Sequence, residues 1–294
     1  MGSIFVVGSV NQDYVLTVDH RPGAGETVTG GTLDIRGGGK GANQAVAAAR
    51  CGAAVTLLAR VGSDAAGIAQ RKDLQRSGVD VSLVTATTGV ATGAAFITVT
   101  PDGENAVTVV PGANAMVAVS DVEAVAGLLN ASSVLVAQLE IPLDTVAAAV
   151  HLCGPTTRVL LNAAPFSPLP VPLLESTDTL VVNEHEAASL LGSPVLGTAG
   201  AKDGAATLLD SGPRCVIVTL GALGAVVADA GGCIHVPAPV VPVVDTTGAG
   251  DVFVGTLAAL LADGQPLDRA AVTAVAHASA SVAFVGARSP LSKH

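Results

Sequence analysis

Asp245-Thr246-Thr247-Gly248-Ala249-Gly250-Asp251 is a glycine-rich turn that follows an apolar, strand-like run and leads directly into a helix predicted over residues 252–261. A strand that passes into a helix in this way is the unit of layered α/β proteins. Glycines allow the backbone to approach a ligand, and the amides and dipole of a first helical turn bind an anion without a basic side chain. The turn therefore predicts an α/β protein with an anion site at the end of a strand.

Apolar, β-branched runs alternate with alanine-rich segments along the chain. The runs expected to form strands are Ile4–Val10, Val55–Ala59, Val134–Ala137, Val159–Leu161, Thr179–Val182 and Val216–Leu220. The segments expected to form helices are Lys40–Cys51, Ala65–Arg76, Asp121–Leu129, Leu143–Leu152, Glu184–Leu191, Ala199–Leu209, Gly250–Leu261 and Asp268–Val285. Runs that are apolar on both faces are typical of parallel strands covered by helices. The pattern predicts a doubly wound, mostly parallel, Rossmann-like sheet in one domain over residues 1–294.

Two early regions, residues 15–35 and 92–110, depart from this alternation. In the second region apolar residues alternate on both sides of a turn at Pro101-Asp102-Gly103, so that Ile97 and Val107 face each other in a predicted hairpin. We expect the two regions to form a small β layer outside the main sheet. This layer is either a sheet edge or a lid over a ligand.

The composition excludes several classes of partner. The 294 residues carry 14 Lys and Arg against 24 Asp and Glu, a formal net charge of −10, without a basic run. Duplex nucleic acid and anionic membranes need a cationic surface, so neither is expected as a partner. No apolar stretch reaches the ~18 residues that span a bilayer, and no basic segment precedes the short apolar run after Met1. The sequence predicts a cytoplasmic protein that binds anions through backbone amides or metal ions.

Two polar segments carry the candidate chemistry. Asp251 stands in the first turn of its predicted helix, where the dipole favours the anionic form of a carboxylate that accepts a proton from an attacking hydroxyl. An ordinary first-turn acidic residue is the alternative. The segment Arg36–Gln44 also opens a helix, and its amides beside Lys40 and Asn43 would hydrogen-bond a polyhydroxylated ligand. A flexible loop before an alanine-rich helix is the alternative there.

Gly38–Gln44 and Asp245–Asp251 together resemble the two signatures of the ribokinase-like (PfkB) sugar kinase family. Further segments fall in the order expected of this family: Val7–Asp13, Pro22–Thr27, Gly112–Asn114, Gln138–Glu140, Asn162–Pro165, Asn183–Glu186 and Thr219–Gly221. The resemblance implies the ribokinase-like fold, in which a small β-sheet lid, here about residues 12–36 and 92–110, closes over the sugar. It also implies a homodimer formed through the lid.

The activity that the resemblance implies is ATP-dependent phosphorylation of D-ribose at its 5-hydroxyl. Asp251 would be the base for this hydroxyl. The amides of Gly248, Ala249 and Gly250 would form an anion hole for charge that develops on the transferred phosphoryl group. Another sugar or a nucleoside is the alternative acceptor, although 2% aromatic residues offer little surface for a nucleobase. A non-catalytic sugar or nucleotide sensor is the alternative from another functional class.

The resemblance also implies which residues surround the sugar. They are Asn11, Asp13, Gly38, Gly39, Lys40, Asn43, Glu140 and Asp251. Paired acceptors such as Asp13 and Glu140 suit a polyol, since each accepts from adjacent hydroxyls, and a helix cap or a solvated strand end is the alternative for each.

The residues implied to bind the nucleotide are Asn183, Glu186, Thr219, Gly221, Gly224, Gly250 and His277. Asn183 and Glu186 resemble the family's Asn-x-x-Glu motif, which organises Mg²⁺, its waters and the phosphates, with Glu186 acting through water. Residues three apart share one helical face, and an ordinary capping pair is the alternative. His277 is implied to lie near the adenine, with a packed helical histidine as the alternative.

Many members of the family are activated by K⁺, and the resemblance implies a potassium site. Its ligands would come from Asp245, Thr247, Ala283, Gly286 and Ser289. Two features depart from the family pattern. The segment from Ala283 to Ser289 is shorter than expected, and Arg36-Gly37 stands where an apolar residue usually precedes the glycine pair.

Overall fold

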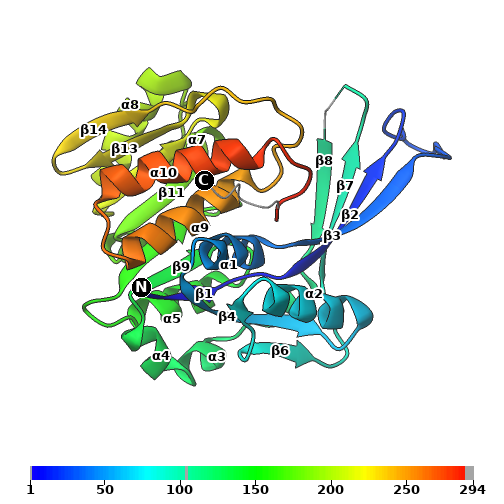
Figure 1. Ribbon diagram of the computed structural model, residues 1–294, viewed down its shortest axis with the longest axis horizontal. Coiled ribbons are helices and arrows are strands. Elements are labelled where there is room, and N and C mark those ends of the chain that lie inside the picture. The colour runs from blue at the N-terminus through cyan, green and yellow to red at the C-terminus, as the bar shows by residue number, and fades with distance from the viewer. Residues whose placement is uncertain (1, 103–104, 289–294) are drawn as a thin grey trace.

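The computed structural model describes residues 2–102 and 105–288. A large sheet with helices on both faces forms the body of the molecule, and a smaller sheet projects from one side (Figure 1). The strand order of the large sheet is β14-β13-β12-β11-β10-β9-β1-β4-β5, with β6 also paired to β4. Its strands are β1 (Ser3–Val7), β4 (Ala54–Gly62), β5 (Val79–Asp80), β6 (Val84–Thr87), β9 (Val134–Gln138), β10 (Arg158–Asn162), β11 (Thr179–Asn183), β12 (Cys215–Thr219), β13 (Ala225–Asp229) and β14 (Gly232–Val236). All pairings are parallel except those of β13 with β12 and β14, which confirms the predicted doubly wound, mostly parallel sheet.

Helices cover both faces of this sheet. One face is covered by α1 (Lys40–Arg50), α2 (Ala65–Arg76), α9 (Ala249–Ala262) and α10 (Leu267–Ser281), the layer nearest the viewer in Figure 1. The other is covered by α3 (Val119–Glu123), α4 (Ala126–Ala131), α5 (Leu143–His151), α6 (Val171–Glu175), α7 (Glu184–Leu191) and α8 (Gly197–Leu209). In β1, Ile4 and Val6 join the first core while Phe5 and Val7 join the second. A strand buried on both faces needs apolar side chains at every position, which is why this run lacks polar alternation.

Helices α1 and α9 pack closely because their contact is built from small residues. A Cβ atom added at Gly255 of α9 would overlap the backbone carbonyl of Gln44, and it would lie 2.6 Å from the Cβ of Ala47 in α1. Only glycine permits this approach. The contact places the N-termini of the two helices, and so the two glycine-rich signatures, beside each other.

The smaller sheet has four strands in the order β3-β2-β7-β8. They are β2 (Asn11–Thr17), β3 (Thr32–Gly38), β7 (Gly93–Val99) and β8 (Asn105–Val110). Ile97 pairs with Val107 across β7 and β8, which confirms the predicted hairpin. Gly103 of the predicted turn lies outside the described residues. The two irregular regions of the sequence therefore form one β layer, separate from the large sheet.

Several element boundaries differ from those predicted. The predicted strand Ile4–Val10 ends at Val7, because the chain leaves the large sheet at Gly8 and enters β2. The predicted helix Asp268–Val285 ends at Ser281, and the Val282 carbonyl instead accepts hydrogen bonds from the amides of Val244 and Asp245. The predicted helix Asp121–Leu129 is replaced by the two short helices α3 and α4.

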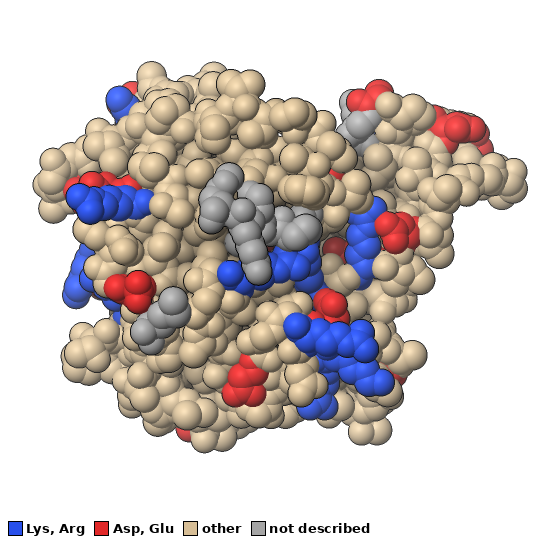
Figure 2. All heavy atoms as spheres, viewed as in Figure 1, with Lys and Arg blue, Asp and Glu red and all other residues tan. Residues whose placement is uncertain are grey.

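Charged residues make up only 13% of the chain. On the face seen in Figure 2, charged side chains lie singly or in small groups on a largely uncharged surface. Among the helices of the described residues, none combines the length and the apolar character that a membrane crossing requires. An anionic ligand must therefore be bound by local features of one site rather than by a broad positive field.

Candidate active site

The candidate site lies where parallel strands of the large sheet end. Four neighbouring strands, β9 to β12, end in polar residues, which are Gln138, Asn162, Asn183 and Thr219. A cavity of about 470 Å³ opens at this edge and is lined by Lys40, Asn162, Ala164, Val182, Asn183, Glu184, His185, Glu186, Thr219, Gly221, Gly248, Gly250 and Asp251. Ligands of open α/β sheets bind at the carboxyl ends of the strands. The structure thus brings residues from both glycine-rich signatures to the expected edge.

Asp251 occupies the first turn of α9 and is buried beside α1. One carboxylate oxygen accepts a hydrogen bond from Asn43 Nδ2 at 3.0 Å, and the other accepts one from Gln44 Nε2 at 2.9 Å. Because each oxygen has an amide donor, the carboxyl plane is fixed. The side chain lines the cavity, so this oriented carboxylate faces a space that a ligand can enter.

Three buried amides lie behind Asp251. Gln44 Nε2 also donates to Asn162 Oδ1 at 2.9 Å, while Gln44 Oε1 accepts from Gln138 Nε2 at 2.7 Å. The bond from Gln138 determines which end of the Gln44 amide is the oxygen, and so directs its NH₂ group toward Asp251. Neither Gln44 nor Gln138 was predicted from the sequence to belong to the site, although both lie inside segments that carry the family resemblance.

The glycine-rich turn presents backbone amides beside Asp251. Gly248 is the N-cap of α9 with a left-handed backbone, φ 76°, and a Cβ atom there would overlap Ala287. The amide of Ala249 donates to the Thr246 carbonyl at 3.2 Å. Within residues 2–102 and 105–288, the amides of Gly248 and Gly250 have no protein acceptor. Of the three amides predicted to bind an anion, these two are available to a ligand.

Lys40 is the first residue of α1 and also lines the cavity. Its amide donates to Glu140 Oε2 at 2.9 Å, and the same oxygen accepts from the hydroxyl of Ser9 at 2.5 Å. Burial disfavours the charged ammonium, but nearby carboxylates, led by Asp251 and Glu140, outweigh this effect and raise the pKa of Lys40. The Lys40 side chain therefore contributes a positive charge to the lining of the cavity.

Asp13 projects from β2 of the smaller sheet and lies against Gly38 of β3. Its Oδ1 is buried and has no hydrogen-bond partner among the described residues. Burial is the main reason that the pKa of Asp13 is raised to about 6, with Glu140 and Asp251 adding to the effect and Arg288 opposing it. A Cβ atom at Gly38 would overlap this carboxyl group. An unpaired buried acceptor of this kind is costly unless a ligand hydroxyl donates to it.

Asn11 and Gly39 complete the edge of the smaller sheet nearest the cavity. Asn11 is buried, and its Oδ1 accepts from Asn114 Nδ2 at 2.7 Å. Gly39 has φ 88° and lies so close to the backbone of Asn11 that a Cβ atom would be 2.7 Å from its nitrogen. Asn114, a residue of the Gly112–Asn114 segment, was given no role from the sequence.

Asn183 and Glu186 form a capping box at the start of α7. The amide of Asn183 donates to Glu186 Oε2 at 2.9 Å, and the amide of Glu186 donates to Asn183 Oδ1 at 2.8 Å. The capping pair, which was the alternative interpretation of this motif, is thus present, and both side chains also line the cavity. Burial raises the pKa of Glu186.

The other predicted nucleotide residues divide into two groups. Thr219 and Gly221 line the cavity, whereas the described lining residues do not include Gly224 or His277. Gly224 has φ 92°, and a Cβ atom there would overlap the carbonyl of Val236. His277 Nδ1 lies 3.4 Å from Thr256 Oγ1, so its ring is packed between α10 and α9.

The sequence of the chain matches a family of known proteins. The model of the pfkB family of carbohydrate kinases matches residues 1–294. The chain belongs to the pfkB family of carbohydrate kinases. Membership confirms the predicted fold and the prediction of an ATP-dependent sugar kinase.

Individual members of the pfkB family show how far the similarity extends. The chain is 36% identical to the ribokinase of Haemophilus influenzae over 290 residues, which cover 98% of the chain and 95% of that protein. It is 38% identical over 295 residues to a bifunctional ribokinase/ribose-5-phosphate isomerase A of Fructilactobacillus sanfranciscensis, covering 99% of the chain but only 54% of that protein, or about half its length. Among solved structures, Arabidopsis thaliana ribokinase complexed with ribose and ATP superposes with a TM-score of 0.86 at 30% identity, covering 98% of the chain and 94% of that structure.

In this pfkB-family chain, Asp245 lies at the start of the glycine-rich turn, where potassium ligands were expected. Its Oδ1 accepts from the Thr247 amide at 2.9 Å, and its Oδ2 accepts from the Gly286 amide at 2.9 Å. Burial alone would raise the pKa of Asp245, but the hydrogen bonds from Thr247 and Gly286 and the charge of Arg36 hold it below its usual value. The Ala283 amide donates to Ala280, and Ser289 lies outside the described residues.

Arg288 contacts the candidate site and was not predicted from the sequence. Its Nε donates to Asn43 Oδ1 at 3.0 Å, and another nitrogen donates to the Gly38 carbonyl at 2.9 Å. A third contact reaches Asp73 of α2 at 2.5 Å. Arg288 thus fixes the amide orientation of Asn43, whose NH₂ group donates to Asp251. No local pattern marked this arginine, because its partners are distant in sequence.

Proposed function

We propose that this chain catalyses the ATP-dependent phosphorylation of D-ribose to D-ribose 5-phosphate. The observation that carries the proposal is the Asp251 carboxylate, which Asn43 and Gln44 orient at a cavity bounded by amides that can receive a phosphoryl group. The relatives named ribokinase, and the similar structure complexed with ribose and ATP, support ribose as the acceptor.

Asp251 acts as the general base in this proposal. The 5-hydroxyl of ribose gives its proton to the carboxylate while its oxygen forms a bond to the γ-phosphorus of ATP. The bond from that phosphorus to the bridging oxygen breaks, and ADP leaves with the electron pair. The amide donors from Asn43 and Gln44 keep the carboxylate aligned with the hydroxyl.

The glycine-rich turn stabilises the transferred group. Negative charge on the phosphoryl oxygens is met by the amides of Gly248 and Gly250 and by the N-terminus of α9, with Ala249 between them. A backbone donor of this kind typically contributes about 10²- to 10³-fold to a rate. Lys40 adds a positive charge on the same side of the cavity.

The sugar is held between the smaller sheet and α1. The carboxylates of Asp13 and Glu140 accept hydrogen bonds from the hydroxyls, Asn43 donates to them, and Lys40 and Asn11 complete the set. Gly38 and Gly39 leave room for the ring because neither has a side chain. The unpaired Asp13 Oδ1 is the acceptor that most needs a hydroxyl donor.

The nucleotide lies over the ends of β11 and β12. Thr219 and Gly221 line its side of the cavity, and Gly224 and His277 are proposed to lie near the nucleotide outside this lining. The described residues contain no group of three or more metal-ligating side chains, which suits Mg²⁺ because this ion is bound through one or two carboxylates together with phosphates and water. Glu186, oriented by Asn183, would hold it through water. Bound Mg²⁺ neutralises phosphate charge.

The smaller sheet serves as the lid in this proposal, with residues 12–36 and 92–110 closing over the sugar and excluding water. Residues alternate along β2, so Tyr14 and Leu16 lie on the face opposite Asp13. That outer face also carries Leu33, Ile35 and Phe96, which are 59%, 54% and 43% exposed. An apolar face of this kind is covered by the same face of a second copy of the chain.

The proposed homodimer has a direct test. Ile35→Asp places a charge on the outer face and should shift the molecular mass in light scattering from dimer to monomer. Val240→Asp is the matched control, because Val240 is fully exposed on the large body. A wild-type protein that is monomeric at micromolar concentration would refute the dimer.

Acceptor identity is tested with ADP release over a panel of D-ribose, 2-deoxyribose, fructose and adenosine. The proposal expects the highest kcat/KM with ribose, and we place the reaction in the cytoplasm, where ATP is available. Strong turnover of another acceptor, without turnover of ribose, would identify that sugar or nucleoside as the acceptor. Binding of ATP and ribose without any turnover would assign the chain as a sensor.

A further inference from the structure

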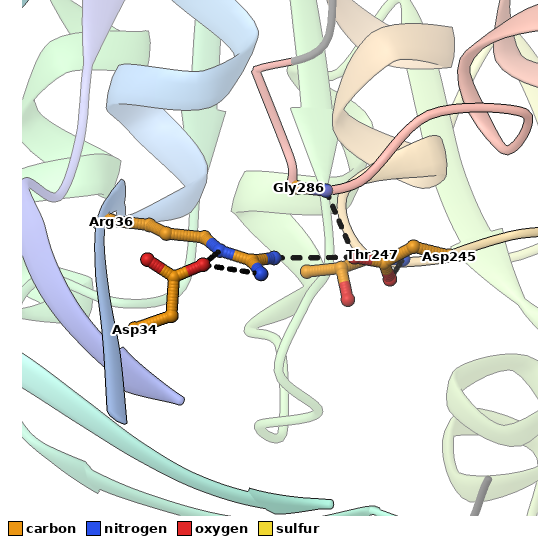
Figure 3. Close-up of polar contacts among 5 residues, drawn as sticks. All are labelled: Asp34, Arg36, Asp245, Thr247 and Gly286. Carbon is orange, nitrogen blue, oxygen red and sulfur yellow. Dashed lines mark hydrogen bonds and ion pairs between the residues drawn. The ribbon is translucent and has the colours of Figure 1, made fainter. Parts of the chain in front are cut away.

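An arginine of the smaller sheet reaches the carboxylate of Asp245, one of the residues expected to contribute to a potassium site. Arg36 extends from β3 toward the loop before α9, and its guanidinium lies 3.4 Å from Asp245 Oδ2 (Figure 3). The same oxygen accepts the Gly286 amide, and the other accepts the Thr247 amide. Asp245 therefore has a cationic partner and two backbone donors from the chain itself.

These contacts do not fit a monovalent cation at Asp245. An ion that bound the carboxylate would share the oxygen with a guanidinium, and the two positive charges would repel each other at short range. Gly286 donates its N–H group to the same carboxylate oxygen, which therefore has two donors from the chain. The described residues thus supply the Asp245 carboxylate with a positive charge of their own.

Arg36 is held in place before any ligand binds. Its Nε and a terminal nitrogen each lie 2.6 Å from Asp34 Oδ2 on the same strand. The side chain of Arg36 is 26% exposed, while that of Asp34 is 57% exposed and so is well screened by water. Asp34 thus fixes the guanidinium with its third nitrogen directed at the more buried Asp245.

A cation at this point has a clear electrostatic role. Asp245 opens the turn whose Gly248 and Gly250 amides face the cavity, so its uncompensated charge would oppose phosphate binding at those amides. We propose that the guanidinium of Arg36 takes the place of a monovalent cation at Asp245, so that nucleotide binding and turnover do not depend on potassium. Arg36 is then a positioning residue, acting through Asp245. The inference rests on the proposed kinase function, in that it requires a phosphate donor at this turn.

The test compares K⁺ with tetramethylammonium at equal ionic strength. ADP affinity is measured by calorimetry, which needs no assumption about the sugar, and initial rates are measured with ribose. The wild type should give the same ADP affinity and the same rate in both salts. Arg36→Met should bind ADP roughly tenfold more weakly in tetramethylammonium, and K⁺ should restore part of the loss because Asp245 is then free to bind it. Arg36→Lys should retain most of the affinity in both salts.

Arg269→Met is the matched control, since it removes an exposed arginine far from Asp245. A several-fold K⁺ activation of the wild type would overturn the inference, even if Arg36→Met failed to fold. An equal loss for Arg36→Met in both salts would assign Arg36 a merely structural role and would also overturn it. Absence of ADP binding to the wild type would instead refute the proposed kinase function.

Discussion

Gln44 of α1 donates one side-chain amide group to both Asp251 of α9 and Asn162 at the end of β10, each at 2.9 Å. The residue that orients the proposed base is therefore itself tied to the central sheet. Gln138 completes the arrangement by donating to Gln44 Oε1. A buried polar network in which each amide is oriented by the next holds its members more firmly than isolated pairs do.

Asp251→Asn should abolish turnover while ADP still binds. The variant loses the proton acceptor, and its NH₂ group would take the place of one carboxylate oxygen and so face an amide donor of Asn43 or Gln44. We expect kcat to fall by at least about 10³-fold, measured as ribose-dependent ADP release, with ADP affinity followed by calorimetry. Asp268→Asn is the matched control, because Asp268 also stands in the first turn of a helix but is exposed. If Asp251→Asn kept most of its activity, Asp251 would not be the base.

Gln44→Met should lower kcat more than it alters KM. Methionine fills a similar volume but cannot donate to Asp251 or accept from Gln138, so the carboxylate loses its alignment. We expect kcat to fall about 10- to 100-fold and the free energy of unfolding to fall by about 1–3 kcal/mol. Steady-state kinetics and urea unfolding measure the two effects, with the exposed Gln75→Met as control. An unchanged kcat would show that the network serves stability alone.

Gly38→Ala should weaken sugar binding and leave nucleotide binding intact. The added methyl group would overlap the Asp13 carboxyl and displace it from the sugar side of the cavity. The KM for ribose should rise by at least about tenfold, as for a lost hydrogen bond to a charged group, while ADP affinity stays constant. Gly127→Ala is the control, because a Cβ atom there meets nothing within 4 Å. A loss of ADP affinity equal to the loss of ribose affinity would contradict the assignment of Gly38 to the sugar side.

Asp13 makes stability and ribose binding depend on pH in opposite directions. Its pKa is raised from 3.8 to about 6 in the folded chain, chiefly by burial. The folded state therefore holds this proton over a range in which the unfolded state has released it. The resulting contribution to stability is fully present below pH 3.8 and is lost as the pH rises through about 6.

Asp13→Asn removes this titration. Relative to the wild type, the variant should gain stability as the pH rises from 4 toward 7, by at most about 3 kcal/mol at roughly 1.4 kcal/mol per pKa unit. Ribose hydroxyls donate best to the ionised carboxylate, so wild-type ribose affinity should fall as the pH drops below about 6. Urea unfolding and calorimetry between pH 4 and 8 measure both effects. A ribose affinity that does not change over this range would show that Asp13 does not bind the sugar.

Much of the fold could be predicted because the strands are apolar on both faces. Ile4 and Phe5 belong to different cores, and only a strand covered by helices on both sides needs apolar residues at adjacent positions. The antiparallel strands β13 and β14 were not predicted, since their short runs carry no marker that distinguishes them from a helix or a loop.

The candidate site was predictable only where its residues lie in short, ordered motifs. Asp251 and Gly248 stand within a single turn, so the local spacing indicates their chemistry. Arg36 meets Asp245 across 209 positions of the chain, and Arg288 meets Asn43 across 245. Such pairs depend on how the smaller sheet and the C-terminal segment pack against α1 and α9, which no local pattern records.

The close contact at Gly255 restricts which parts of this enzyme tolerate substitution. Helices α1 and α9 have no room to slide against each other, since a single Cβ atom at Gly255 would strike the backbone of Gln44. Asp251 and the glycine-rich turn before α9 are therefore held in a fixed position relative to Asn43 and Gln44 of α1. Asn11 and Asp13 belong to the smaller sheet, outside these two helices. Under the proposed function, substitutions in the smaller sheet would exchange one acceptor alcohol for another while the proposed base and phosphate-binding turn stay in place.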